Sequence, residues 1–190
     1  RIEPDYPVKA YAQTVPTGVR RIETTLNLVA KIDGNSDPMD VDIAIIDTGL
    51  DQEHPDLNIA GGVCLIQNCS SWDDQNGHGT HVAGTIMAAG VNPDAQGMAY
   101  QANLTAYGWG SDISEMSAEA AGGLILSNHS YGKVDGWAWD FRDDGLWAWL
   151  GDVDISTTED ADFGSYDNKS MRVDTVANAA PYYLPVIDAA

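Results

Sequence analysis

The run from Val41 to Ile46 constrains the fold most strongly, because five of its six residues are apolar and most of these are β-branched. A run of this kind is typical of a central strand in a parallel sheet, covered by helices on both faces. It ends at Asp47-Thr48-Gly49. In open α/β sheets the ligand crevice lies outside the carboxyl ends of the strands. An acid at Asp47 is therefore placed where chemistry is expected.

Segments with helical and strand patterns alternate along the rest of the chain. The stretch from His78 to Ala89 is rich in glycine and alanine and predicts a helix with His78 at its N-terminus. Further helices are expected at 112–121 and 171–180, an amphipathic segment at 19–30, and further strands at 103–109, 124–128 and 183–189. This alternation predicts an α/β fold with a doubly wound, mostly parallel sheet and helices on both of its faces.

The stretch from Gly136 to Trp149 carries four of the six tryptophans. Its aromatic residues alternate on either side of an Asp-Gly turn, which predicts a β-hairpin. We expect the hairpin to bury its rings on its own domain. The alternative is an exposed aromatic wall that contacts a substrate or a partner.

The charge balance and the two cysteines limit the partners and the compartment. The 190 residues include 9 basic and 29 acidic ones, for a formal charge of −20. Such a surface repels nucleic acid and anionic membranes. The sequence has no run of 18 apolar residues, so no membrane span is expected. Cys64 and Cys69 have four residues between them. A disulfide across this small loop fits an extracellular or periplasmic protein, and two buried free thiols are the alternative.

Asp47 and His78 are the candidate catalytic residues. An acid at a strand end can hold one nitrogen of a histidine, and the other nitrogen then serves as a base toward a hydroxyl nucleophile. A different interpretation makes Asp47, His78 and His81 the ligands of a zinc ion with one open position.

Several segments resemble those of the subtilisin-like serine proteases. The Asp and His signatures of that family are matched by Asp47-Thr48-Gly49, His54-Pro55-Asp56-Leu57 and the stretch 78–85, and further likeness lies at 97–104, 128–132 and 183–190. The resemblance implies a subtilisin-like fold in which about 133–165 is an insertion containing the tryptophan hairpin. It makes Asp47 the orienting carboxylate and His78 the base. It assigns substrate contacts to Ser130, Tyr131 and Gly132 and a structural role to His81.

The same resemblance implies a calcium site and a precursor. Gln13, Asp56 and Asn92 match positions of a family calcium site, and oxygen ligands suit calcium. Residues 1–10 resemble the tail of an inhibitory propeptide, and 11–190 resemble the N-terminal portion of the catalytic domain. Processing of such a zymogen is expected near Ala10-Tyr11 or Tyr11-Ala12.

The chain also departs from the family pattern. The family's Gly-Thr-Ser-Met-Ala nucleophile motif is absent from these 190 residues, and the oxyanion-hole asparagine is expected just after Ala190. We therefore expect a secreted serine endopeptidase acting on peptides and proteins, of which this chain supplies only the Asp and the His. The chain alone should be inactive, should pair with the C-terminal remainder of the protease, and can self-associate through exposed apolar surface. The alternative is a non-catalytic pseudoprotease that serves as a binding module.

Overall fold

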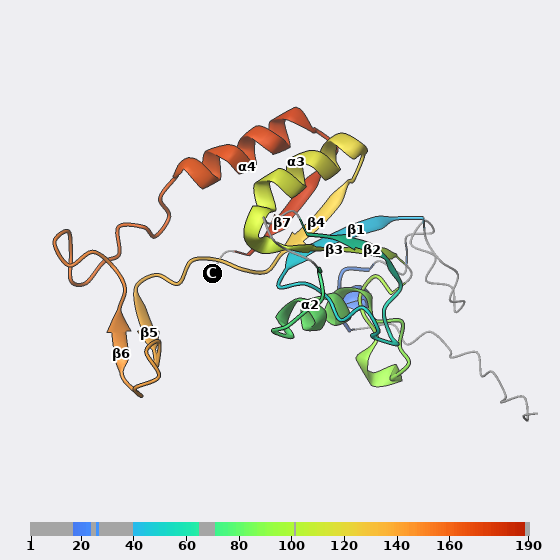
Figure 1. Cartoon of the computed structure of the whole chain (residues 1–190), viewed down its shortest axis with the longest axis horizontal. Helices are drawn as coiled ribbons and strands as arrows, with labels where there is room; N and C mark the ends of the chain where they lie inside the picture. Colours follow the sequence, from blue (N-terminus) through green and yellow to red (C-terminus); the bar gives the residue numbers. More distant parts are fainter. Residues whose placement is uncertain (1–16, 24–25, 27–39, 65–70, 101, 189–190) are drawn as a thin grey trace, which may run out of the picture. The chain divides into compact units, whose positions relative to one another are not determined.

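The computed structural model describes residues 17–23, 26, 40–64, 71–100 and 102–188 (Figure 1). The chain divides into two compact units, one ending at Asp112 and the other beginning at Ile113. Each unit contains parallel strands and helices, and the two are described separately below.

The first unit is built on three parallel strands in the order β2-β3-β1. Strand β1 (Asp42–Asp47) pairs along its whole length with β3 (Asn103–Gly108), so that Asp47 lies opposite Gly108. Strand β3 also pairs with β2 (Ile59–Val63). Only the first residue of β1 is exposed, which confirms the buried central strand that its apolar run predicts. Burying an isoleucine contributes about 1.5–3 kcal/mol to folding.

Helix α2 (His78–Met87) packs against β1 in the same unit. It buries Ala83 and Met87, and its small residues allow this close approach. The helix confirms the prediction from the glycine- and alanine-rich stretch. The other helical segments among the described residues of this unit are short: α1 (Thr17–Arg21), η3 (Pro93–Ala95) and η4 (Trp109–Ser111).

The second unit contains two more parallel strands, β4 (Leu126–His129) and β7 (Leu184–Ile187). Helix α3 (Asp112–Gly122) precedes β4, and helix α4 (Asn168–Ala179) precedes β7. Met116 of α3 and Val176 of α4 are buried. All four elements were expected from the sequence, with ends that differ by a few residues.

The tryptophan hairpin forms a separate two-stranded ribbon in the second unit. Strands β5 (Trp137–Trp139) and β6 (Trp147–Trp149) are antiparallel, and Trp137 lies opposite Trp149. The expectation that this hairpin buries its rings is wrong, because Trp137 is 57% exposed and Trp147 61% exposed. Successive side chains of a strand point to opposite faces, and it is Ala148, on the other face, that is buried.

The predicted class is therefore confirmed: an α/β fold with mostly parallel strands and an additional antiparallel hairpin. The hairpin falls inside the expected insertion at about 133–165. Residues 1–10, the expected propeptide tail, lie outside the described residues, so the expected boundary at 10/11 stays a prediction. None of the described helices is both long enough and apolar enough to span a bilayer.

Candidate active site

Asp47 occupies the carboxyl end of the most buried strand of the first unit. It is the last residue of β1, and its exposed fraction is 0%. Its Oδ1 accepts a hydrogen bond from the backbone N–H of Thr48 at 2.7 Å. A carboxylate removed from water in this way needs hydrogen-bond donors or a cationic partner. The donors around Asp47 are therefore part of what the site requires.

His78 supplies the second donor to the same oxygen. Its Nδ1 lies 2.7 Å from Asp47 Oδ1, although the two residues are 31 positions apart in the sequence. The histidine is the first residue of α2 and follows Gly77, whose φ of 95° lies in the left-handed region that glycine tolerates. Its side chain is 47% exposed. A carboxylate at Nδ1 favours the tautomer that carries its proton there, which leaves Nε2 able to accept a proton.

Asp74 organises the loop that leads into His78. Its Oδ1 accepts the backbone N–H groups of Asn76 at 2.9 Å and Gly77 at 2.8 Å, and the hydroxyl of Thr48 at 2.9 Å. Its Oδ2 accepts both the backbone N–H and the hydroxyl of Thr80, at 2.9 and 2.7 Å. Burial raises the pKa of this carboxyl, but the hydrogen bonds from Thr80, Gly77 and Asn76 outweigh burial and hold the pKa well below its usual range.

Thr48 connects Asp74 to the acid–histidine pair. The Thr48 hydroxyl accepts the backbone N–H of Gly79 at 2.9 Å while it donates to Asp74. The end of β1 and the start of α2 are thus joined twice, once through Asp47 and His78 and once through the residues that follow them.

Sequence reasoning missed Asp74. The available signal was an acid shortly before a helix start, a position at which carboxylates accept the free N–H groups of the first turn.

The other two histidines of the first unit do not belong to this pair. His81 is exposed on α2. His54 accepts the backbone N–H of Asp56 at its Nδ1, 3.3 Å away. Across the described residues, no group of three or more His, Cys, Asp or Glu side chains lies close enough to hold a metal ion. The interpretation of Asp47, His78 and His81 as zinc ligands is therefore wrong.

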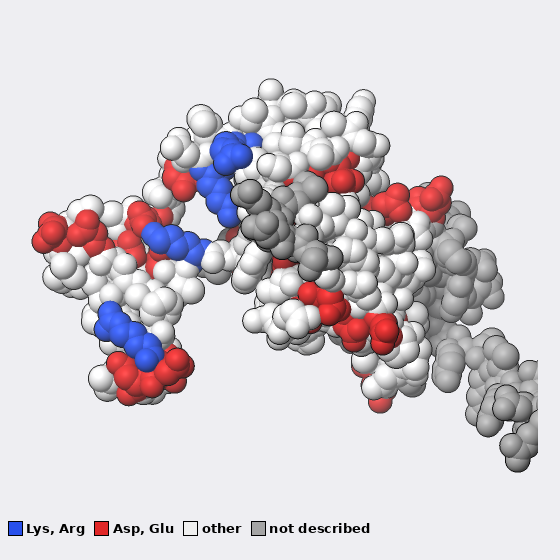
Figure 2. All heavy atoms as spheres, in the orientation of Figure 1, with Lys and Arg blue, Asp and Glu red and all other residues white. Residues whose placement is uncertain are grey.

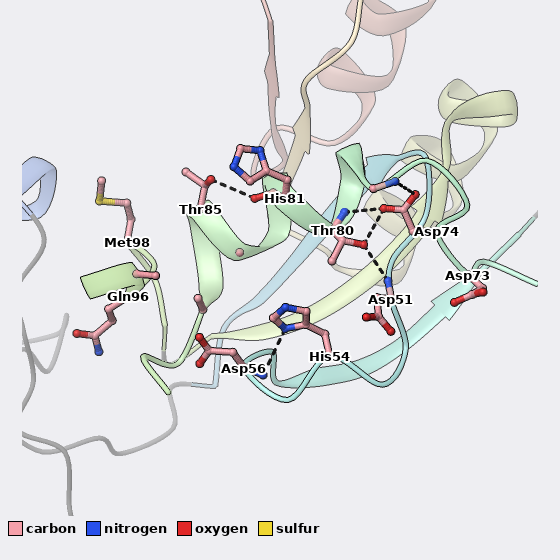
Figure 3. Close-up of a pocket in the computed structure, with 14 residues that line it drawn as sticks. Asp51, His54, Asp56, Asp73, Asp74, Thr80, His81, Thr85, Gln96 and Met98 are labelled. Atoms are coloured by element: carbon pink, nitrogen blue, oxygen red, sulfur yellow. Dashed lines mark hydrogen bonds between the residues drawn. The ribbon is translucent and has the colours of Figure 1, made fainter. Parts of the chain in front are cut away.

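A groove of about 810 Å³ lies beside α2, and neither Asp47 nor His78 lines it. Figure 3 shows the loop that carries Asp51, His54 and Asp56 facing the helix across this groove. The hydroxyl of Thr80 accepts the backbone N–H of Asp51 at 2.9 Å and so ties the loop to the helix. The groove therefore does not include the acid–histidine pair itself, although Asp74 and Gly77, which precede His78, line it.

The residues expected to bind calcium accept backbone N–H groups of the loop around 91–94 where they are described. Gln13 lies outside the described residues. Asp56 is buried, and its Oδ1 accepts the backbone N–H of Val91 at 2.8 Å. Asn92 Oδ1 accepts the backbone N–H of Asp94 at 3.1 Å and caps η3. These two residues do not by themselves form a calcium site.

The residues expected to contact substrate follow β4 in the second unit. Ser130 accepts a hydrogen bond at Oγ from the side-chain amide of Asn128, 2.9 Å away. The hydroxyl of Tyr131 lies 3.0 Å from Nδ1 of His129. Gly132 is exposed. The substrate role of these three residues stays a prediction.

A buried polar network lies along β4 and includes His129. Ser127 Oγ lies 2.7 Å from His129 Nε2 and 2.5 Å from the hydroxyl of Tyr183. Burial raises the pKa of the Tyr183 hydroxyl, and the hydrogen bond with Ser127 opposes that shift. Ser127 and His129 are both buried, so this serine–histidine contact is inaccessible to a substrate and serves packing.

Only one of the two cysteines of the predicted disulfide, Cys64, lies among the described residues. Cys64 comes directly after β2 and takes part in a disulfide. Cys69 lies outside the described residues. The pairing of these two cysteines therefore stays a prediction.

Comparison with known proteins identifies relatives of this chain. The model of the subtilase family matches residues 39–181. The chain is 40% identical over 142 residues to an alkaline protease of Alkalihalobacillus alcalophilus, a match covering 70% of this chain and 36% of the relative. It is 37% identical over 106 residues to subtilisin E of Bacillus subtilis (strain 168), covering 55% and 27%. It is 44% identical over 95 residues to a thermostable alkaline protease of Halalkalibacterium halodurans, covering 50% and 25%. The matched part spans only about a quarter to a third of these relatives.

Proposed function

Because the chain belongs to the subtilase family, we propose that it is part of a serine endopeptidase in which Asp47 and His78 are two members of the catalytic triad. The observation that carries the proposal is the 2.7 Å contact between His78 Nδ1 and the fully buried Asp47. The family membership and the names of the relatives support the same reaction.

In this proposal His78 moves the proton. Its Nε2 takes the proton from a serine hydroxyl as that oxygen attacks the peptide carbonyl, and later gives the proton to the leaving amine. Asp47 keeps Nδ1 protonated and stabilises the imidazolium that forms. Asp74 acts indirectly, by holding the loop and the helix start that carry His78.

The nucleophile and the side-chain donor of the oxyanion hole come, in this proposal, from the C-terminal remainder of the protease. The 190 residues contain no Gly-Thr-Ser-Met-Ala motif, and they match about a third of the alkaline protease of Alkalihalobacillus alcalophilus. Removal of the nucleophile eliminates the acyl-enzyme. The chain alone should therefore hydrolyse no peptide.

Peptide binding, maturation and compartment complete the proposal. Ser130, Tyr131 and Gly132 form one wall of the substrate site, and the substrates are peptides and proteins. Residues 1–10 belong to a propeptide of a zymogen that is secreted, and Cys64 and Cys69 form a disulfide in that oxidising compartment. Intact-mass analysis of the mature protein should show a new N-terminus at Tyr11 or Ala12, whereas retention of residues 1–10 would contradict the proposed maturation.

A structural calcium ion is a further part of the proposal and rests on the family resemblance. Asp56 is its best-supported ligand, because its carboxylate has a second oxygen besides the Oδ1 that accepts the N–H of Val91, and calcium prefers oxygen donors. Asn92 fits less well, because its side-chain oxygen caps η3. Calcium should raise the unfolding temperature of the chain, and Asp56→Asn should remove that increase. An equal increase in the variant would exclude Asp56 as a ligand.

The proposed reaction is tested on the complete protease. We expect Asp47→Asn to lower kcat by on the order of 10⁴-fold, because the wrong histidine tautomer is then favoured. The same substitution should leave KM nearly unchanged. Full peptidase activity in the variant would contradict the proposed triad, and an inactive wild-type protease would favour the alternative of a non-catalytic binding module.

A further inference from the structure

A cavity beside the tryptophan hairpin combines aromatic rings with carboxylates. It has a volume of about 430 Å³ and lies within the second unit. Its walls include the rings of Trp137, Trp149 and Phe163 and the side chains of Glu159 and Asp160. The five come from both hairpin strands and from the acidic segment that follows the hairpin, and we call them the aromatic cage. The proposed peptidase reaction uses none of them.

The carboxylate of Asp160 is held rigidly in the cage. Only 8% of this residue is exposed. Its Oδ2 accepts the backbone N–H of Gly136 at 2.7 Å, and its Oδ1 accepts that of Asp162 at 3.1 Å. These two hydrogen bonds, from Asp162 and Gly136, lower the pKa of Asp160. The cage therefore keeps a fixed negative charge at neutral pH.

Glycines allow the rings and this carboxylate to come together. A side chain on Gly151 would begin 2.6 Å from the ring of Trp149 and 3.0 Å from the carboxyl carbon of Asp160. A side chain on Gly136 would begin 3.0 Å from the ring of Phe163. The cage is thus built by close packing that larger residues at these two positions would prevent.

Two of the tryptophan rings that line the cage meet at an angle. The centroids of Trp137 and Trp149 are 5.3 Å apart, and their planes are inclined by 51°. Aromatic faces carry negative electrostatic potential and attract cations, most strongly when the ring is tryptophan. Inclined rings with carboxylates beside them suit a positively charged nitrogen that carries carbon substituents.

The rest of the surface favours the same kind of ligand. Acidic side chains gather, with a few Lys and Arg side chains among them, over the part of the molecule that carries β5 and β6 (Figure 2). The nearby Lys133 does not line the cavity, and its ammonium contacts the carboxylates of Asp135 and Asp162. An anion would be repelled from this region. A neutral apolar molecule would gain nothing from the two carboxylates of the cage.

We propose that the aromatic cage binds an organic cation, either the side chain of a lysine or arginine in a peptide or a small quaternary ammonium compound. Both sources share the same chemistry, a positive nitrogen against tryptophan faces with carboxylates at its side. The buried indole Nε1 of Trp149 has no hydrogen-bond acceptor among the described residues. Of the two sources, only the peptide carries a carbonyl oxygen to accept that hydrogen, because choline has none.

The binding is tested by calorimetric titration of the whole chain. The probes are choline, the N-acetyl methylamides of lysine and arginine, and 3,3-dimethylbutan-1-ol, which has the shape of choline without its charge. We expect saturable binding of at least one cation, about tenfold tighter than that of the neutral alcohol. Tighter binding of the amino-acid amides assigns the site to peptides, and tighter binding of choline assigns it to small ammonium compounds. Equal affinity for choline and the alcohol, or no saturable binding, would overturn the proposal.

Variants locate the site. Trp137→Leu should weaken the binding about tenfold, whereas Trp139→Leu should not change it, because Trp139 is on the same strand and equally exposed but lies outside the cage. Glu159→Gln should weaken binding about fivefold without loss of folding, because Glu159 is exposed. Urea unfolding of each variant checks that the chain remains folded. Equal weakening by Trp137→Leu and Trp139→Leu, or unchanged binding by Glu159→Gln, would contradict the assignment.

Discussion

Gly79 approaches Gly49 so closely that no side chain fits between them: a Cβ on Gly79 would lie 2.2 Å from the carbonyl oxygen of Gly49. This contact brings the first turn of α2 against the residues that follow Asp47. The distance between Asp47 and His78 therefore depends on a residue that has no chemistry of its own.

Gly79→Ala should move the start of α2 and lower stability. We expect the free energy of unfolding to fall by about 1–3 kcal/mol, the usual cost of forcing extra atoms into a packed site. Gly84→Ala in the same helix is the matched control, because nothing lies within 4 Å of its added Cβ, and it should leave stability unchanged or raise it by about 0.5–1 kcal/mol. Urea unfolding of both variants is the measurement. Equal stability of the Gly79→Ala variant and the wild type would contradict the close packing.

Asp74→Asn should change how stability depends on pH. The folded state lowers the pKa of Asp74 below its ordinary value of 3.8, so this carboxylate stabilises the fold above that pH. The contribution is lost as the pH falls through 3.8 and below, because the unfolded chain then binds the proton first. The stability difference between wild type and variant should therefore be largest near neutral pH and should shrink on acidification.

The measurement for Asp74 is the urea unfolding midpoint at several pH values between 3 and 7. Asp73→Asn is the matched control, because Asp73 is exposed and, among the described residues, its carboxylate accepts a hydrogen bond only from the Gln75 side chain. The control should show almost no pH-dependent difference. A difference for Asp74→Asn that grows on acidification would have the wrong sign for the proposed hydrogen bonding.

The chain should self-associate through β7. Leu184 is 60% exposed on this strand, and Tyr182 just before it is even more exposed. Exposed apolar surface next to a strand favours association with another copy. Leu184→Lys should weaken the association measured by sedimentation velocity over a range of concentrations. Leu146→Lys, at an equally exposed position on the hairpin turn, should have no effect, and a strictly monomeric wild type would contradict the prediction.

The sequence predicted the elements whose side chains repeat in a clear pattern. The apolar run of β1, the alanine-rich α2 and the alternating tryptophans of the hairpin were all recognised. Strand β2 was missed, because Gly61 and Gly62 interrupt its pattern and its register with β3 shifts between Ile59 and Gly61. Its pairing depends on neighbours from other parts of the chain, and no local pattern contains that information.

In the site, too, the residues that belong to clear local patterns were predicted and those that depend on distant contacts were not. Asp47 and His78 could be found because a strand end, a helix start and a family signature meet there. Asp74 was missed, because an acid before a helix start is only a weak signal and most of its importance comes from hydrogen bonds with Thr48 and Thr80. The exposure of Trp137 was foreseen only as the alternative to burial of the rings. Alternation shows that the rings share a face but does not show which face is covered.

The central claim, that His78 is the base of a serine peptidase, is tested most directly by labelling the complete protease with a serine-directed fluorophosphonate. The second-order rate constant of labelling should fall by at least about 10⁴-fold in His78→Ala, because the serine then lacks its base. It should stay within about threefold of wild type in His81→Ala, an exposed histidine of the same helix that is not bonded to Asp47. Undiminished labelling in His78→Ala, or an equal loss in His81→Ala, would contradict the assignment.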